Sequence, residues 1–424
     1  MSTTSLHPHS SPPARHVAPS SARRHGAGFW LIAFALLTAM AFSAVPSPLY
    51  PLYQHRDHFS TFMVTVVFAV YAVGVVISLL LAGHVSDWVG RKRILIPALA
   101  LEAVAAIMFL LWPQLPVLIA ARLINGISMG LITATATAYL HELHSRHRPG
   151  AAPARFEMVS TAANIGGLGV GPLVAGFLAQ YVSQPLRVPY IVFAVLLLLA
   201  VIAVGLTPET VEERFERPAW RPQRIRAIGD GKRYLTAIAS STSAFAILGL
   251  FTALAPGFVG GTLHHPSRLL AGVTLFVIFA AATVSQAATG RLRPGLRSAI
   301  GLGFTAVGLV MVAAAMGTAG LALFLAGGAV AGAGAGVLFK SGVGSVAAMA
   351  TSALRGEAMA GLFLFAYIGM IVPVLGMGIA TEYISATTAM YWFTGLLIAF
   401  LAAIAALQVS SGRRPPAGPR ITRS

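Results

Sequence analysis

Arg122 and Glu102 are the residues of this sequence best placed for chemistry, because both lie inside long apolar stretches. Arg122 is the only basic residue of the apolar run 116–139, with Asn125 three positions after it, and Glu102 is the only carboxylate well inside any apolar run. Desolvation favours the protonated form of a carboxyl group, whereas a nearby arginine favours the carboxylate. Glu102 is therefore a candidate proton carrier, and the alternative is a structural ion pair on a helix peripheral to the cavity. Arg122 is a candidate cavity residue for coupling or substrate binding, and the alternative is a structural hydrogen-bonding hub.

Three other polar side chains in apolar runs are candidates for contact with a solute. Lys340 lies in the run 319–348, where it either attracts an anion or extends its amine to the membrane surface. Ser240 and Ser243 belong to a polar row in the run 234–256. Their hydroxyl groups are candidate hydrogen-bonding partners of a substrate, although serine is also common where membrane helices pack. The residues predicted to couple substrate and proton are therefore Arg122, Asn125, Glu102, Lys340, Ser240 and Ser243.

The elements that position these residues are helices that cross a membrane. Of the 424 residues, 57% are hydrophobic and only 10% are charged, whereas soluble proteins carry about 25% charged residues. Twelve apolar runs are each long enough to cross a hydrocarbon core of about 30 Å, and they are continuous rather than alternating, which argues against a β-barrel. We predict an all-α membrane protein with twelve transmembrane helices. The runs lie at 28–49, 61–82, 94–112, 116–139, 156–181, 188–207, 234–256, 269–290, 299–316, 319–348, 358–381 and 387–409.

The one long polar segment, 208–233, divides these runs into two groups of six. The loop GRLRPGLR at 290–297 follows the second run of its group, as GHVSDWVGRKR at 83–93 does in the first group. Repeats of this kind indicate two pseudo-symmetric six-helix bundles with a binding site between them, near the middle of the membrane. Arg23 and Arg24 leave a signal peptide as the alternative for the N-terminal segment. The predicted organisation is a disordered tail at 1–27, a bundle at 28–207, a linker at 208–233, a bundle at 234–409 and a tail at 410–424.

The basic residues predict the orientation of the chain. The net charge is +17, but the cations lie in short clusters between apolar runs and form no basic face, which argues against nucleic-acid binding. With the N-terminus inside the cell, 24 of the 29 Lys and Arg residues fall in cytoplasmic segments and only Arg56, Arg187 and Arg268 fall outside. Cytoplasmic loops are rich in Lys and Arg, so both termini and the linker are predicted to be cytoplasmic. Cysteine is absent, which excludes thiolate metal sites, and we expect no metal and no cofactor.

Four short motifs carry a resemblance to a known family. The loop after the second run contains Gly83, Asp87, Gly90, Arg91 and Lys92; the fourth run contains RLING, Arg122 to Gly126; and Pro-Glu-Thr at 208–210 follows the sixth run. The fifth run carries Gly167, Gly171, Pro172 and Gly176. The chain resembles the major facilitator superfamily over residues 28–409, and its fifth run is similar to that of the family's drug–proton antiporters, although Ala175 replaces one glycine of that motif.

The resemblance implies a conformational latch formed by Gly83, Asp87, Gly90, Arg91, Lys92 and Glu142. Asp87 is expected at the start of the eleventh helix, Arg355 to Met359, where free backbone N–H groups favour a carboxylate by about 0.3–1 kcal/mol, or about 2 kcal/mol if the site is partly buried. Arg91 is expected to pair with Glu142. These contacts would form only when the cytoplasmic side is closed. The alternative is a basic loop that merely orients the chain, with a solvated Asp87.

The sequence as a whole predicts a secondary transporter that works by alternating access and is not an enzyme. The leading hypothesis is proton-coupled efflux of a small organic compound, a drug or a metabolite, by a monomer with both termini in the cytoplasm of a bacterium and twelve helices in its plasma membrane. One alternative, supported by Arg122 and Lys340, is uptake of an organic anion or metabolite. The other is a membrane sensor that does not transport. No nucleotide-binding motif is present, which disfavours transport driven by ATP.

Overall fold

The computed structural model describes residues 19–82, 85–152, 154–211, 221–223, 225, 229–351 and 354–412, and within them every regular element is helical. Twelve of the described helices are long and apolar enough to cross a membrane, which confirms the predicted all-α transmembrane fold. Gly83, half of the linker 208–233 and the outer parts of both predicted tails lie outside the described residues.

The N-terminal half contains six membrane-crossing segments, of which the fifth is interrupted by one π-helical turn. Its elements are α1 (Pro19–Ala44), a 3-10 turn (Ser47–Leu49), α2 (Tyr50–Asp57), α3 (Thr61–Ala82), α4 (Ser86–Val89), α5 (Arg91–Leu111), α6 (Leu115–His147), α7 (Ala154–Thr161), the π turn (Ala162–Gly166), α8 (Gly167–Tyr181) and α9 (Val188–Leu206). The C-terminal half comprises α10 (Gly231–Gly260), α11 (Arg268–Ala288), α12 (Pro294–Thr318), α13 (Leu321–Met349), α14 (Arg355–Tyr383) and α15 (Ala386–Gly412).

The first helix begins earlier than its hydropathy predicted. We expected a disordered tail to residue 27, but α1 starts at Pro19. Proline is favoured in the first turn of a helix because its φ is already helical and its missing N–H would have no intrahelical partner. The polar residues that follow, which include Arg23 and Arg24, continue the same helix beyond its apolar part. Hydropathy located the apolar segment and missed this polar extension.

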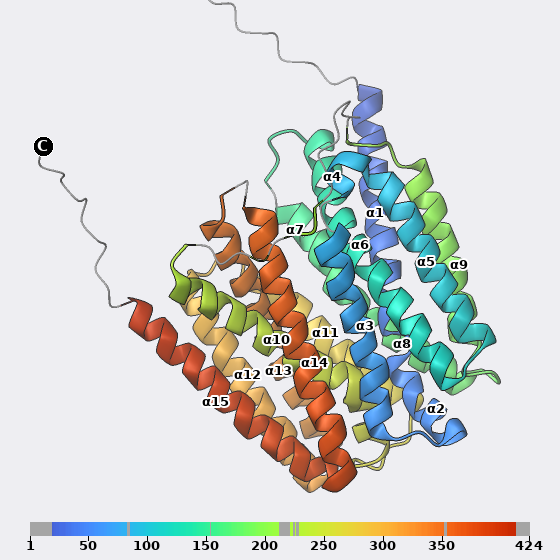
Figure 1. Ribbon diagram of the computed structural model, residues 1–424, viewed down its shortest axis with the longest axis vertical. Coiled ribbons are helices and arrows are strands. Elements are labelled where there is room, and N and C mark those ends of the chain that lie inside the picture. The colour runs from blue at the N-terminus through green and yellow to red at the C-terminus, as the bar shows by residue number, and fades with distance from the viewer. Residues whose placement is uncertain are drawn as a thin grey trace, which may run out of the picture.

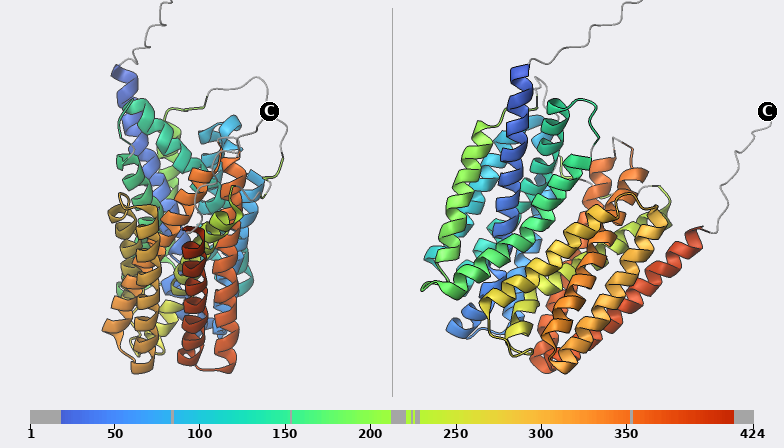
Figure 2. Two further views of the ribbon diagram at one scale, coloured as in Figure 1. Left: turned by 90° about the vertical axis from the view of Figure 1, so that its left-hand side faces the viewer. Right: turned by 180° about the vertical axis from the view of Figure 1, so that it is seen from behind.

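The two halves lie side by side, and both ends of the described chain are on the same membrane face (Figure 1). We call the face at which α1 begins and α15 ends the terminal side, and the opposite face the distal side. The halves meet where α3 packs against α14 and α8 packs against α11. In the view from behind, the helices of the two halves diverge toward the terminal side (Figure 2).

The contacts between the halves are closest near the distal side. A Cβ atom added to Gly378 of α14 would lie 2.2 Å from Thr65 Oγ1 of α3, and one added to Gly176 of α8 would lie 2.5 Å from the Arg268 carbonyl oxygen of α11. Glycine therefore allows the helix axes to approach at both crossings, as small residues do in membrane proteins. The structure is thus a conformation in which the distal side is held closed.

Candidate functional site

α5 and α6 bring Glu102, Asn125 and Arg122 into one hydrogen-bonded chain inside the N-terminal half. Asn125 Nδ2 donates to Glu102 Oε1 over 2.7 Å, and Arg122 Nη1 donates to Asn125 Oδ1 over 2.9 Å. All three side chains are fully buried. Among the described residues Glu102 and Arg122 form no direct ion pair, because the amide of Asn125 lies between them. The two charged groups that the sequence singled out are therefore linked through a neutral bridge.

Arg122 is held by groups from three further positions of the N-terminal half. Its Nη1 donates to the Ser43 carbonyl oxygen of α1 over 2.7 Å, and its guanidinium carbon lies 4.5 Å from the ring centroid of Tyr71 and 6.0 Å from that of Phe68. Aromatic faces attract cations, more strongly where water is excluded. Nε and Nη2 of Arg122 have no hydrogen-bond partner among the described residues. Both rings belong to α3, the helix that meets α14 of the other half.

Ser128 gives Glu102 a partner in either protonation state. Ser128 Oγ is in hydrogen-bond contact with Glu102 Oε2 and lies 2.9 Å from the Asn125 carbonyl oxygen. A hydroxyl group has one proton to donate but can also accept. When Glu102 is ionised, Ser128 donates to it. When Glu102 is protonated, its O–H donates to Ser128 Oγ, and Ser128 donates to the carbonyl of Asn125. The same geometry thus accommodates gain and loss of a proton.

A second polar network, on the terminal side, is centred on Arg91. Arg91 Nη2 lies 2.7 Å from Glu142 Oε1 and its Nε lies 3.3 Å from Glu142 Oε2, while Nη1 contacts Asp87 Oδ1 at 2.6 Å and Ser86 Oγ at 2.7 Å. Arg91 is 6% exposed, so the ion pairs are partly shielded from water. The pairing of Arg91 with Glu142 is therefore present although the halves diverge on this side (Figure 2). Both residues belong to the N-terminal half, so the expectation that this pair forms only when that side is closed is wrong.

Asp87 contacts Arg91 here rather than the start of α14. Its side chain is 62% exposed, and none of its hydrogen bonds among the described residues reaches α14, which does begin at the expected Arg355. The helices of the two halves diverge toward this side (Figure 2). The contact between Asp87 and α14 stays a prediction for the state in which the terminal side is closed.

Glu209 is a functional residue that sequence reasoning missed. Its Oε1 accepts from the backbone N–H of Arg91 over 3.1 Å and its Oε2 from that of Lys92 over 3.0 Å, so it caps the start of α5. Gly90, just before this helix, has a φ of +114°, and a Cβ atom there would lie 3.1 Å from Glu209 Oε2. Thr210 Oγ1 donates to Glu142. The Pro-Glu-Thr motif at 208–210 contains this residue, but the motif alone does not indicate which helix Glu209 caps.

The glycines of the fifth membrane segment serve two packing contacts. A Cβ atom added to Gly171 would lie 1.9 Å from the Ala41 carbonyl oxygen of α1, and one added to Gly167 would lie 2.6 Å from Met40 Cβ. Gly176 instead faces α11 of the other half, and Pro172 lies within α8 against Gly272 of the same helix α11. The motif therefore fixes α8 against α1 within its own half and against α11 across the interface.

The other candidate residues lie in the C-terminal half, apart from the hydrogen-bonded chain of Glu102, Asn125 and Arg122. They are Lys340, Ser240 and Ser243. Lys340 Nζ donates to the Gln286 carbonyl oxygen over 2.7 Å, near the end of α11, where a cation is favoured by the helix dipole. Ser240 and Ser243 donate to the carbonyls of Thr236 and Ala239, four residues earlier in α10, and both are buried. Bonds of this kind satisfy a serine within its own helix. In this conformation both hydroxyl groups are paired within α10.

A cluster of half-buried aromatic rings in the C-terminal half was also not predicted. The ring centroids of Phe245 in α10 and Phe339 in α13 are 5.3 Å apart, those of Phe245 and Tyr367 are 5.1 Å apart, and those of Phe339 and Phe363 are 6.1 Å apart. Phe363 and Tyr367 are four residues apart in α14 and so share one face of that helix, which was the available signal. The cluster joins α10, α13 and α14 through ring contacts.

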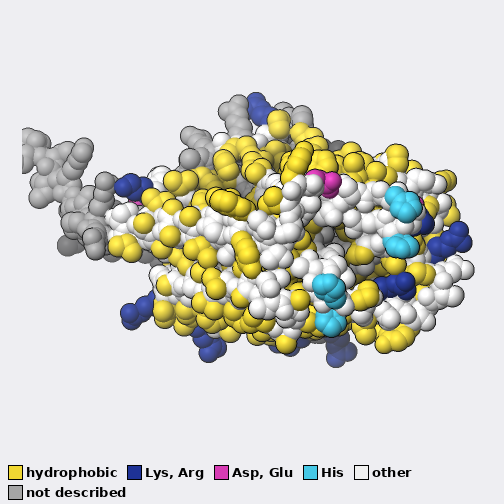
Figure 3. Space-filling model, turned by 90° about the horizontal axis from the view of Figure 1, so that it is seen from below, with side chains coloured by type: hydrophobic (Ala, Val, Ile, Leu, Met, Phe, Trp, Pro, Cys, Tyr) yellow, Lys and Arg dark blue, Asp and Glu magenta, His cyan; other side chains and the backbone are white. Residues whose placement is uncertain are grey.

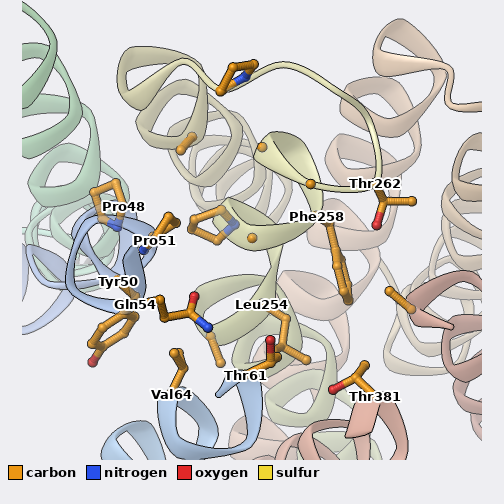
Figure 4. Close-up of a pocket in the computed structure, with 18 of the residues that line it drawn as sticks. Pro48, Tyr50, Pro51, Gln54, Thr61, Val64, Leu254, Phe258, Thr262 and Thr381 are labelled. Carbon is orange, nitrogen blue, oxygen red and sulfur yellow. The ribbon is translucent and has the colours of Figure 1, made fainter. Parts of the chain in front are cut away.

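The distal face is hollowed between the two halves (Figure 3). The cavity there has a volume of about 870 Å³ and is lined by both halves. In Figure 4, Tyr50 and Gln54 of the N-terminal half lie across the cavity from Phe258 of α10 and Thr381 of α14. This volume is within the range of about 300–1,000 Å³ that small-molecule pockets occupy. The cavity lies on the distal side of the close glycine contacts between the halves.

The family model described as "Major Facilitator Superfamily" matches residues 31–297. The chain belongs to this superfamily. Its fold is that of solved superfamily transporters: the structure of a mutant of the nucleoside transporter NupG has a TM-score of 0.66 at 15% identity, and that of the human organic anion transporter MFSD10 (TETRAN) has a TM-score of 0.65 at 17% identity. Each likeness covers 90% of this chain and 99% of the other. The protein is therefore a multi-pass membrane transporter of the major facilitator type.

Two curated relatives from Bacillus subtilis (strain 168) are similar in sequence over part of their length. Multidrug resistance protein 1 is 28% identical over 178 residues, which are 42% of this chain and 44% of that protein. The arabinose-proton symporter is 34% identical over 83 residues, which are 20% of this chain and 18% of that protein. The chain thus aligns with less than half of the length of either relative, and the names of the two relatives refer to different compounds.

Proposed function

We propose that this superfamily member is a proton-coupled efflux transporter of a small organic compound with an apolar or aromatic part. The observation that carries the proposal is the pairing of Glu102 with Ser128, which provides hydrogen bonds for both the protonated and the ionised carboxyl group. Among the carboxylates that the structure describes, Glu102 alone is fully buried. The names of the two curated relatives, a multidrug resistance protein and a proton symporter, support drug-like substrates and proton coupling.

In the proposed mechanism the proton acts on the interface between the halves. Arg122 stays charged, since an arginine does not lose its proton in proteins, so protonation of Glu102 changes the net charge of the two groups from zero to +1. Arg122 is packed against two rings of α3, and α3 packs against α14. The change in charge therefore occurs beside a helix that must move when the two halves rock.

The orientation inferred from the basic residues makes the terminal side cytoplasmic. The distal side is closed, so the aromatic cluster faces a path from the cytoplasm and the distal cavity becomes the exit for the substrate. In the opposite state Asp87 reaches the start of α14 and holds the cytoplasmic side closed. The protein would act as a monomer in a bacterial plasma membrane and needs no cofactor, with the proton as its coupling ion.

Proteoliposomes with an imposed pH gradient test this function. An acidic lumen should drive accumulation of a lipophilic cationic dye in the lumen, because protons leave as the dye enters. The control is the same gradient in liposomes without protein. Absence of any dye movement that responds to the pH gradient contradicts the proposal.

The alternative with support in the structure is uptake of an organic anion together with protons. Nε and Nη2 of the buried Arg122 lack hydrogen-bond partners among the described residues, and a carboxylate could pair with both. In the same liposomes, an acidic exterior should then drive accumulation of a radiolabelled aromatic carboxylate. Anion uptake without dye transport would replace the efflux proposal, and transport of neither class would favour a sensor.

A further inference from the structure

A small basic cavity lies on the terminal side of the N-terminal half, apart from the residues discussed so far. It has a volume of about 260 Å³ and is enclosed by the start of α1, the end of α6 and the start of α7. Arg23 and Trp30 of α1 lie seven residues apart, on one face of that helix. His144 and His147 of α6 and Arg155 of α7 complete the polar part of the lining. Four of these five side chains are basic.

His144 is the deepest of these groups and lacks a hydrogen bond on one side. It is only 6% exposed, and its ring centroid lies 5.6 Å from that of Phe29. Its Nε2 atom is buried and has no hydrogen-bond partner among the described residues. Buried polar atoms in proteins are nearly always paired with protein or with a bound molecule. An unpaired imidazole nitrogen in the lining of a cavity therefore points to a ligand in that cavity.

The charge of the cavity selects an anion. No acidic residue is part of its lining, and among the described residues neither Arg23 nor Arg155 takes part in an ion pair. The guanidinium of Arg155 lies 5.6 Å from the ring of Trp30, which orients it at the edge of the cavity. Arginine matches the oxygen geometry of a phosphate group and can donate two parallel hydrogen bonds to it. Two arginines and two histidines around one cavity thus fit a phosphate.

The position of the cavity favours a lipid as the source of that phosphate. Trp30 is 53% exposed, and α1 lies on the outer surface of the N-terminal half in the view from behind (Figure 2). Tryptophan is enriched at the level of the lipid headgroups. The volume is slightly below the ~300 Å³ of the smallest pockets for drug-sized ligands, which suits a headgroup better than a transported compound.

We infer that this cavity is a binding site for the phosphate group of an anionic phospholipid. Basic pockets between transmembrane helices are known to receive the headgroups of anionic lipids. Arg23 and Arg155 contact the phosphate, and His144, protonated on both ring nitrogens beside the anion, donates to it from Nε2 at the floor of the cavity. The inference does not depend on the direction of transport or on its coupling ion. Free inorganic phosphate has the same chemistry and is distinguished by the experiment.

The test compares two double variants of the full chain in binding phosphatidylglycerol. The pocket variant is Arg23→Gln with Arg155→Gln, and the matched control is Arg24→Gln with Arg148→Gln, which removes the same charge from neighbouring positions that do not line the cavity. All four arginines are exposed or half-exposed, so the fold should be kept. Delipidated protein is titrated with the lipid and its bound form is counted by native mass spectrometry, with zwitterionic phosphatidylcholine as the reference lipid.

The pocket variant should bind phosphatidylglycerol about 30-fold more weakly than the unchanged chain. Each arginine near an anionic lipid increases the affinity about fivefold, and the variant lacks two of them. The control variant should lose much less of its affinity for phosphatidylglycerol than the pocket variant, because its arginines do not line the cavity. Equal losses in the two variants would overturn the inference and assign the binding to general surface charge. In a second arm, inorganic phosphate replaces the lipid. Thermal stabilisation by phosphate that only the pocket variant lacks, without selective lipid binding, would keep the phosphate site and reject the lipid as its source.

Discussion

Replacement of Glu102 by glutamine should leave the protein folded and remove its coupling to protons. Glutamine has the shape of a protonated glutamate: its amide nitrogen can donate to Ser128 Oγ, and its oxygen can accept from Asn125 Nδ2, which now donates to Glu102 over 2.7 Å. Both hydrogen bonds are preserved, so we expect a loss of stability below about 1 kcal/mol. Replacement by alanine removes both hydrogen bonds and leaves a void.

The cost of the alanine variant follows from those two losses. Hydrogen bonds between membrane helices contribute about 0.6 kcal/mol each on average and about 1.7 kcal/mol at most, and the void adds at least about 1 kcal/mol. Glu102→Ala should therefore lose about 2–5 kcal/mol relative to the unchanged chain. Thermal unfolding in nanodiscs should place the glutamine variant near the unchanged chain and the alanine variant clearly below both.

Transport assays then separate a proton carrier from a structural hydrogen-bonding group. If Glu102 carries the proton, Glu102→Gln loses transport driven by a pH gradient but keeps exchange of labelled for unlabelled substrate at equal pH. Glu382→Gln is the matched control, because it removes one exposed carboxylate of α14 that accepts only from the Phe62 amide among the described residues. Full gradient-driven transport by Glu102→Gln would refute the carrier role. A glutamine variant as unstable as the alanine variant would show that the site requires the ionised carboxylate.

Three further perturbations test the remaining parts of the site. Asp87→Asn keeps an oxygen acceptor for Arg91 on an exposed side chain, so folding should be unchanged. Loss of the charge should weaken the contact of Asp87 with the start of α14 by up to about 2 kcal/mol and nearly abolish transport. Normal transport by this variant would remove the latch from the mechanism. Gly176→Ala should destabilise the conformation with the closed distal side by about 1–3 kcal/mol. A cysteine placed at Thr381 of the cysteine-free chain should then react faster with a maleimide. Gly257→Ala is the control and should leave the labelling unchanged, because an added Cβ there meets nothing within 4 Å. Glu209→Gln should cost about 0.5–2 kcal/mol, as losses of helix caps do, and an unchanged melting temperature would contradict its capping role.

The helices could be predicted from the sequence because the membrane imposes their length and hydropathy. Twelve apolar runs correspond to twelve helices. The start expected for the eleventh helix from the family resemblance, Arg355 to Met359, includes the observed start of α14 at Arg355. The polar start of α1 was missed because residues 19–27 carry no apolar signal, although they continue a helix. Hydropathy reports where a helix is inside the lipid, and it does not report where the helix ends.

The site was less predictable because its contacts join distant parts of the chain. Arg122 and Glu102 were identified since charge inside an apolar run is costly, but the bridge through Asn125 depends on how α5 faces α6. Glu209 caps a helix that begins 118 residues earlier, which no local pattern reveals. The hydrogen bond from Lys340 to a backbone oxygen of α11 could not be predicted from the sequence either, because every residue has such an oxygen.

Glu102, the proposed proton carrier, and the aromatic cluster lie in different halves, and this separation constrains how the two can be coupled. The counterparts of α5 and α6 in the second half, α12 and α13, contain no carboxylate, so no equivalent of Glu102 exists there. Arg122 stacks on Tyr71 of α3, and Tyr367 of α14 contacts Phe245 in the aromatic cluster. Since α3 packs against α14, this helix pair connects the network around Arg122 with the aromatic cluster. On the proposed mechanism a change in the charge beside Arg122 therefore reaches the substrate as a movement of α3 against α14.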